Sequence, residues 1–154
     1  MSQGVRRYGR ELALKVLFGL HDLVITPEQA LADFWRSFRF DNDVLGEAVD
    51  SFDEEISGDV RDFAEQLVRG VVEHLEKIDA AIERAASNWT LQRMARVDLA
   101  LLRLGTYELL YCDDIPVSVS INEAIEIGKR FGTKETPGFV NGILDKISKG
   151  RSKP

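Results

Sequence analysis

Apolar residues recur along most of this chain at the three- and four-residue spacing of an α-helix. In the first such stretch, one helix face is formed by Ala13, Val16, Leu17, Leu20 and Leu23, which predicts a buried stripe. No alternation of apolar and polar residues is long enough to predict a strand, and no internal repeat is present. The pattern predicts an all-α fold, a compact bundle of about seven helices.

Capping patterns predict where the next helices begin. A capping box at Thr26 and Gln29 predicts a second helix over residues 27–38. Its expected core residues are Leu31, Phe34, Trp35 and Phe38. Asp59 is expected to cap one long helix whose apolar spacing continues to about residue 82.

The most apolar stretch of the chain lies in its second half. Residues 96–112 are apolar nearly all round, which predicts a helix in the centre of the bundle. Ser120 and Glu123 form the pattern of another capping box, and Gly132 is expected to end that helix. Thr136 is expected to open the last helix.

Composition narrows the class of protein. A chain of 154 residues, 44% hydrophobic and 30% charged, is expected to form one globular domain over residues 1–154. The single Cys112 excludes an internal disulfide, and the separation of His21 from His74 gives no zinc-ligand spacing, so we expect no metal and no cofactor. With neither a signal peptide nor an apolar run of membrane-spanning length, we expect a cytoplasmic protein without a membrane partner.

Catalytic patterns are missing from the sequence. There is no nucleophile elbow, no phosphate-binding glycine loop and no histidine pair at metal spacing. Nine acidic residues lie between Asp41 and Asp62 against Arg61 alone, and we interpret about residues 40–58 as a solvated acidic loop rather than as an acid/base pair. We therefore expect no enzymatic activity.

Positive charge gathers at the start of the first predicted helix, although the formal net charge is -6. Arg6, Arg7 and Arg10 lie where the helix dipole favours anions, and each misplaced cation loses about 0.3–1 kcal/mol. Arginine side chains beside unsatisfied backbone N–H groups favour a phosphate. Phe18 follows on the face of Arg7 and Arg10, where it suits stacking on unpaired bases. Two interpretations stay open, a solvated helix start and an RNA-binding surface.

Four longer stretches give the sequence a family resemblance. It resembles the NusB transcription antitermination factor family over nearly its full length, with the same stretches in the same order and spacing. The stretches are "RRYGRELALKVLF", "LLRLGTYELLY", "IPVSVSINEAIEIGKRFG" and "FVNGILDKI".

The resemblance implies a function as well as a fold. It implies a NusB-like helical bundle that binds boxA-type single-stranded RNA together with the small-subunit ribosomal protein NusE. With other Nus factors, such a complex acts on elongating RNA polymerase, notably on ribosomal RNA operons. Asp98 matches the region that meets NusE. The RNA-binding residues that it implies are Arg6, Arg7, Arg10, Phe18, Lys134, Glu135, Phe139 and Asn141.

Some positions depart from the family or allow another interpretation. Val117-Ser118 stands where an aromatic-basic pair is common, and Pro137-Gly138 replaces residues that are often polar or basic. Asparagine is a mediocre helix former, so Asn122 and Asn141 are expected, from the residues alone, to be buried polar groups that tie helices together. Direct RNA contact is the alternative for both residues, and it is favoured more for Asn141 than for Asn122.

Two other functions remain open from the sequence. The same bundle occurs as the amino-terminal RNA-binding part of certain RNA cytosine methyltransferases, which would make this chain a fragment. A helical protein–protein adaptor is the other alternative, and it would have no affinity for RNA even with NusE present.

Overall fold

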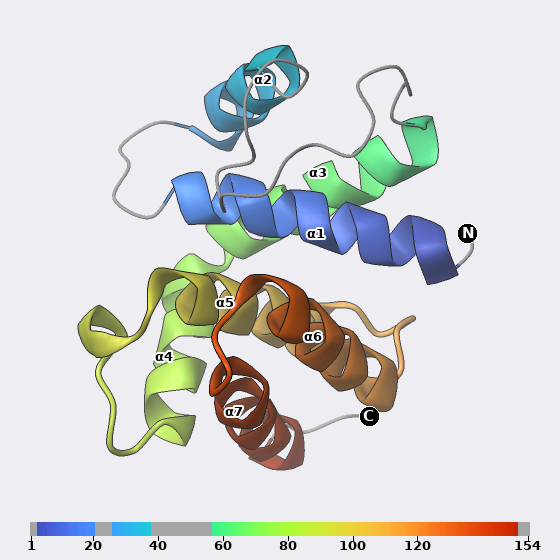
Figure 1. Cartoon of the computed structure of the whole chain (residues 1–154). Coiled ribbons are helices and arrows are strands. Elements are labelled where there is room, and N and C mark those ends of the chain that lie inside the picture. The colour runs from blue at the N-terminus through green and yellow to red at the C-terminus, as the bar shows by residue number, and fades with distance from the viewer. Residues whose placement is uncertain (1–2, 21–25, 38–56, 151–154) are drawn as a thin grey trace. The chain divides into compact units, whose positions relative to one another are not determined.

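The computed structural model describes residues 3–20, 26–37 and 57–150, and every regular element in these ranges is a helix (Figure 1). The elements are α1 (Gln3–Gly19), α2 (Pro27–Ser37), α3 (Gly58–Glu73), α4 (Leu75–Ala85), the 3₁₀ helix η1 (Leu91–Arg93), α5 (Arg96–Tyr111), α6 (Val117–Phe131) and α7 (Thr136–Gly150). The predicted all-α fold is confirmed. None of these helices is long and apolar enough to cross a membrane.

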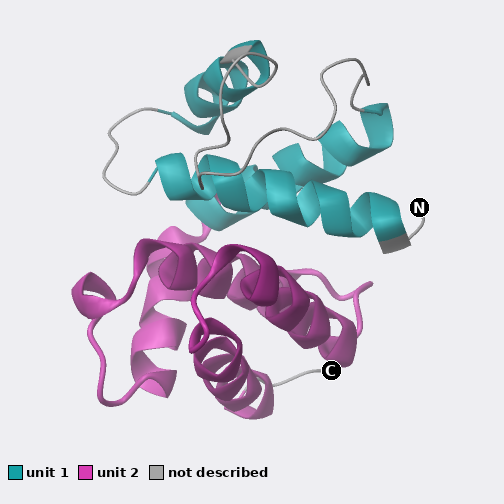
Figure 2. Ribbon diagram, viewed as in Figure 1, with its two compact units in different colours: residues 1–72 teal, residues 73–154 magenta. Residues whose placement is uncertain are grey.

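The chain divides into two compact units, Met1–Val72 and Glu73–Pro154 (Figure 2). A single domain over residues 1–154 stays a prediction. The predicted acidic loop lies outside the described residues except for Ser57 and Gly58, and so do His21, Leu23 and Phe38.

A close approach between α1 and α3 organises the first unit. A Cβ placed on Gly9 would lie 2.8 Å from Cδ2 of Phe63 and 3.4 Å from the carbonyl oxygen of Val60, so only glycine allows this contact. Nearby, Leu12 and Val60 form a buried cluster with Ala64. The half-buried side chains packed against this cluster are Val5, Phe34 and Trp35.

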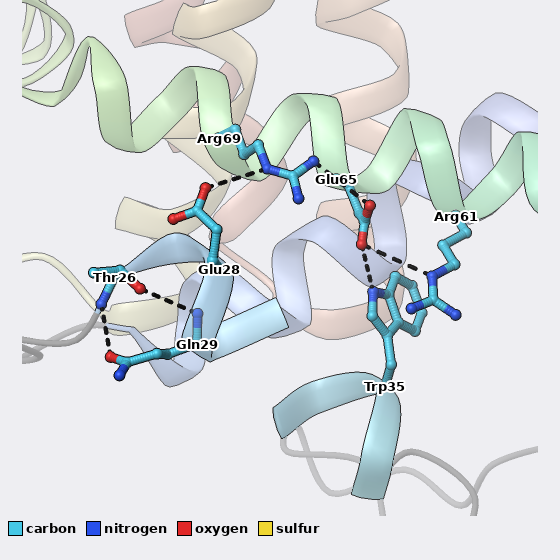
Figure 3. Close-up of polar contacts among 7 residues, drawn as sticks. All are labelled: Thr26, Glu28, Gln29, Trp35, Arg61, Glu65 and Arg69. Carbon is cyan, nitrogen blue, oxygen red and sulfur yellow. Dashed lines mark hydrogen bonds and ion pairs between the residues drawn. The ribbon is translucent and has the colours of Figure 1, made fainter. Parts of the chain in front are cut away.

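Polar contacts join α2 to α3 (Figure 3). The indole Nε1 of Trp35 donates a hydrogen bond to Oε2 of Glu65 at 2.9 Å, while the guanidinium of Arg61 lies 4.9 Å from the centre of the Trp35 ring. Farther along α3, Arg69 contacts both Glu65, at 3.5 Å, and Glu28 of α2, at 3.4 Å. Trp35 therefore contributes both apolar and polar contacts to the helix pair, which explains why it is only half-buried.

The capping box before α2 is confirmed. The backbone N–H of Gln29 donates to Oγ1 of Thr26, and the N–H of Thr26 donates to Oε1 of Gln29, both at 3.2 Å (Figure 3). Two free backbone donors at the helix start are satisfied in this way.

The prediction of one long helix capped by Asp59 is wrong in two respects. The cap is Ser57, whose Oγ accepts the N–H of Val60 at 3.2 Å, and the helix is interrupted at His74. There the backbone leaves the helical region, with φ -107° and ψ 19°, and the imidazole stacks on the ring of Tyr111 with centroids 3.9 Å apart. The apolar spacing continues on both sides of the interruption, so periodicity alone could not detect it.

In the second unit α5 packs against α4, α6 and α7, as its apolar character predicted. A Cβ on Gly105 would lie 2.8 Å from Cδ1 of Leu144, so α5 and α7 approach closely there. Toward α4, Arg103 makes a two-pronged contact with Asp79, each hydrogen bond being 2.9 Å long. This charged side chain of the central helix is thus neutralised by a partner of matching geometry.

The capping box expected at Ser120 and Glu123 is wrong. Pro116 is the N-cap of α6, so the helix begins at Val117 and both residues lie inside it. Ser120 is buried, and its hydroxyl donates a hydrogen bond to Oε1 of the buried Glu108 of α5 at 2.9 Å. The Ser-x-x-Glu pattern at Ser120 and Glu123 therefore marks buried polar positions inside α6 rather than its start. Gly132 ends α6 and Thr136 begins α7 as predicted.

Candidate nucleic-acid interface

The first group of predicted RNA-binding residues lies on α1, in the first unit. The first turn of this helix contains no acidic residue and includes Arg6, with Arg7 directly after it. Arg6, Arg7 and Phe18 are half-buried, so each presents part of its side chain to solvent. The backbone N–H groups and the arginines at this helix start favour a negatively charged ligand.

Arg10 departs from the expectation that it faces RNA. It is only 2% exposed, and its guanidinium lies 5.5 Å from the centre of the Phe63 ring. Leu14, one turn further along the same face, is fully buried. Gly9 brings α1 against α3, and Arg10 stacks on the ring that Gly9 admits. The helix face that runs from Arg7 to Phe18 is therefore buried at its centre. Arg10 stabilises the packing of α1 against α3.

The second group lies in the second unit, in the turn before α7 and in its first turns. Lys134, Glu135 and Asn141 are exposed, and Phe139 is half-buried. The turn is ordered by Thr133, whose hydroxyl donates to Oε2 of Glu135 at 3.3 Å. One cation, polar groups and an aromatic ring thus come together within two helical turns.

The expectation that Asn122 and Asn141 are buried polar ties is wrong, because both are exposed. The polar groups that tie α5, α6 and α7 together are instead Ser120 with Glu108 and Thr136 with Asp98. An exposed asparagine can donate and accept hydrogen bonds with an external ligand.

Asp98, the residue assigned to the NusE region, lies in the first turn of α5 and is half-buried. Its Oδ1 accepts a hydrogen bond from the hydroxyl of Thr136 at 2.6 Å. This bond connects the start of α5 to the start of α7. The candidate protein-partner residue and the second RNA group therefore share one local structure.

Trp89 was not among the site residues predicted from the sequence. This residue is 49% exposed, and its ring meets that of Phe139 edge to face, with centroids 5.7 Å apart and an angle of 76° between the ring planes. The available signal was a tryptophan within the polar "SNWT" break between two helices, where no helical core needs one.

By its fold, this is an all-α protein built from short packed helices. Residues 7–149 match the model of the NusB family. The transcription antitermination protein NusB of Syntrophotalea carbinolica is 59% identical, over 97% of this chain and 95% of its own length. That of Geobacter sulfurreducens is 47% identical, over 94% of each chain. The chain belongs to the NusB family.

Solved structures agree with this assignment. NusB of T. maritima is 38% identical, with a TM-score of 0.71 over 96% of this chain and 93% of that one. A chain of a complex of the antitermination factors NusB and NusE with double-stranded RNA has a TM-score of 0.77, over 97% of this chain and 100% of that one. It is 23% identical, so this second likeness concerns the fold alone.

Proposed function

We propose that this chain is a non-enzymatic transcription antitermination factor that binds boxA-type single-stranded RNA together with ribosomal protein NusE. The observation on which this rests is the family match over residues 7–149, with similar relatives named transcription antitermination proteins. Together with other Nus factors it acts in the cytoplasm on elongating RNA polymerase, notably on ribosomal RNA operons.

The half-exposed arginines of α1 support RNA as the ligand. Arg6 and Arg7 bring two positive charges to a helix start without an acidic residue in its first turn. A sequence selected for helix stability alone would place acidic residues there. Phosphate contacts made by such arginines supply affinity for nucleic acid without base preference.

The exposed groups at the start of α7 can contact the RNA bases, which phosphate contacts do not. Phe139 offers a partly accessible aromatic ring, and Asn141 offers a donor and an acceptor. Unpaired bases are recognised by stacking on rings and by hydrogen bonds to their edges, which favours single-stranded RNA. Lys134 adds a positive charge in the adjoining turn. The bond from Thr136 to Asp98 supports a joint role with NusE, because it couples the NusE region to this turn.

A salt titration tests the proposal. Fluorescence anisotropy measures binding of a boxA RNA to the protein, with and without NusE, across several salt concentrations. An Arg6→Gln/Arg7→Gln double variant should bind more weakly, and its log–log salt slope should fall by about 0.7 for each phosphate that the variant no longer neutralises. Arg36→Gln is the matched control, because Arg36 is an exposed residue of the first unit that pairs with Asp33 on α2. Its slope should equal that of the wild type.

Two results would contradict the proposal at different levels. No RNA binding at low salt in the presence of NusE would reject the antitermination function and favour a helical adaptor. Normal binding with equal slopes for the double variant and the wild type would retain the function but reject the arginine contacts.

A further inference from the structure

Trp89 is an exposed large aromatic side chain in the second unit. It lies in the segment between α4 and η1, where its backbone N–H donates to the carbonyl of Ala86 at 2.9 Å. That hydrogen bond fixes the backbone from which the indole projects. Packing in the apolar core does not explain a tryptophan at this position, because 49% of the residue remains exposed. An ordered, half-exposed indole on a defined turn is a surface available to a ligand.

The neighbour of Trp89 connects it with the proposed RNA site. Its ring meets Phe139 edge to face at 5.7 Å, and the N–H of Phe139 is bonded to the carbonyl of Glu135 at 3.1 Å. In an edge-to-face pair, neither ring covers both faces of the other, so each ring keeps a face that the other does not cover. The two rings therefore form an aromatic platform, defined here as Trp89 with Phe139, which lies beside the turn that contains Lys134.

The charge of the chain segment that contains Trp89 favours a polyanion as the occupant. Between Arg84 and Asp98 the chain has no acidic residue, and it contains Arg93 and Arg96, both exposed. Single-stranded RNA combines a negative backbone with flat bases, and its binding sites combine cations with aromatic rings.

We propose that the aromatic platform stacks one unpaired base of the bound RNA, with Trp89 as the principal contact. This inference rests on the proposed function, since it assigns one further contact to the same RNA. Stacking on an aromatic ring is tolerant of base identity, so the platform should add affinity rather than sequence preference.

Tryptophan fluorescence reports on the contact directly. The chain has two tryptophans, and Trp35 lies in the other unit. A Trp35→Phe variant therefore retains Trp89 as its single reporter, and a Trp89→Phe variant retains Trp35. Titration with boxA RNA, after saturation with NusE, should quench the emission of the first variant and leave that of the second unchanged.

Affinity measurements supply the second readout. Trp89→Leu should weaken RNA binding by about 5- to 150-fold, the range for one stacked base, while Trp89→Phe should weaken it much less. The salt slope should stay that of the wild type, because no charge changes. An RNA series with one abasic nucleotide at a time should contain one position at which wild type and Trp89→Leu bind equally. Circular dichroism verifies that each variant is folded.

The outcomes separate this inference from the proposed function. Wild-type protein that binds boxA RNA, with Trp89→Leu binding as tightly and no quenching of Trp89, overturns the platform and leaves the function standing. Weaker binding of NusE by Trp89→Leu in the absence of RNA, with no abasic position that removes the difference, overturns it in favour of a protein contact. Wild-type protein that binds no RNA overturns both.

Discussion

The hydroxyl of Thr136 donates a hydrogen bond to Oδ1 of Asp98 at 2.6 Å and accepts one from the N–H of Thr133 at 3.0 Å. One side chain thus holds the turn before α7 and attaches it to the first turn of α5. A Cβ at Gly132 would collide with this same hydroxyl, so the turn has no room for another residue type there. The residues that this arrangement presents, Lys134 and Glu135, belong to the proposed RNA site.

Thr136→Val should remove the hydrogen bond between the starts of α5 and α7 while preserving side-chain shape. The half-buried carboxylate of Asp98 would be deprived of this donor, so the free energy of unfolding should fall by about 1–3 kcal/mol in urea denaturation. RNA affinity should fall as well, because the turn is then less well supported. Thr90→Val is the control, since Thr90 is an exposed residue of the second unit whose side chain makes no capping hydrogen bond. Equal stability of both variants would contradict a structural role for the bond to Asp98.

Helix positions were largely predictable from the sequence, because apolar periodicity and capping residues act locally. The box at Thr26 and the start at Thr136 are of this kind. The pattern at Ser120 fails for a physical reason. At a helix start, a Ser-x-x-Glu pair bonds to free backbone N–H groups, whereas inside a helix the same two side chains bond to neighbouring side chains. Here the helix begins after Pro116, four residues before Ser120, so the pair lies inside it.

Ser120→Ala should therefore destabilise the core of the second unit rather than the start of a helix. The substitution removes the hydroxyl that bonds to the buried Glu108 at 2.9 Å, and a bond to a charged group contributes about 1.5–3 kcal/mol. Urea denaturation measures the decrease in stability. Ser118→Ala, at an exposed position of the same helix, should change the free energy of unfolding by less than about 0.5 kcal/mol. If the two variants behave alike, the contact with Glu108 contributes nothing to stability.

Gly9→Ala and Gly4→Ala should have opposite effects within one helix. A Cβ on Gly9 would lie 2.8 Å from the buried ring of Phe63, and such overpacking costs about 1–3 kcal/mol. A Cβ on Gly4 meets nothing within 4 Å, so alanine should stabilise α1 by up to about 1 kcal/mol. Thermal unfolding of the two variants distinguishes the signs, and a stabilised Gly9→Ala variant would refute the close approach of α1 and α3.

The site was less predictable than the fold. The sequence placed Arg6, Arg7 and Arg10 together by helical spacing, but spacing cannot tell which face of α1 is covered by another helix. The glycine at position 9 admits the Phe63 ring, and the adjacent Arg10 is buried against it. Trp89 was missed because its contact is distant in the sequence. Its partner Phe139 lies 50 residues later in the chain, and no local pattern connects the two.

Substitution of Arg7 and of Arg10 should separate RNA binding from stability. Arg7→Gln removes a half-exposed charge, so the log–log salt slope of RNA binding should fall by about 0.7. Arg10→Gln removes the buried guanidinium beside Phe63, where a desolvated cation–π contact contributes about 2 kcal/mol, so the free energy of unfolding should fall. Its salt slope should stay that of the wild type when binding is measured well below the unfolding temperature. An Arg10→Gln variant with full stability and a reduced slope would show that Arg10 reaches the phosphates directly. Because Arg10 is buried against α3 in this structure, that result would mean that α1 moves when RNA binds.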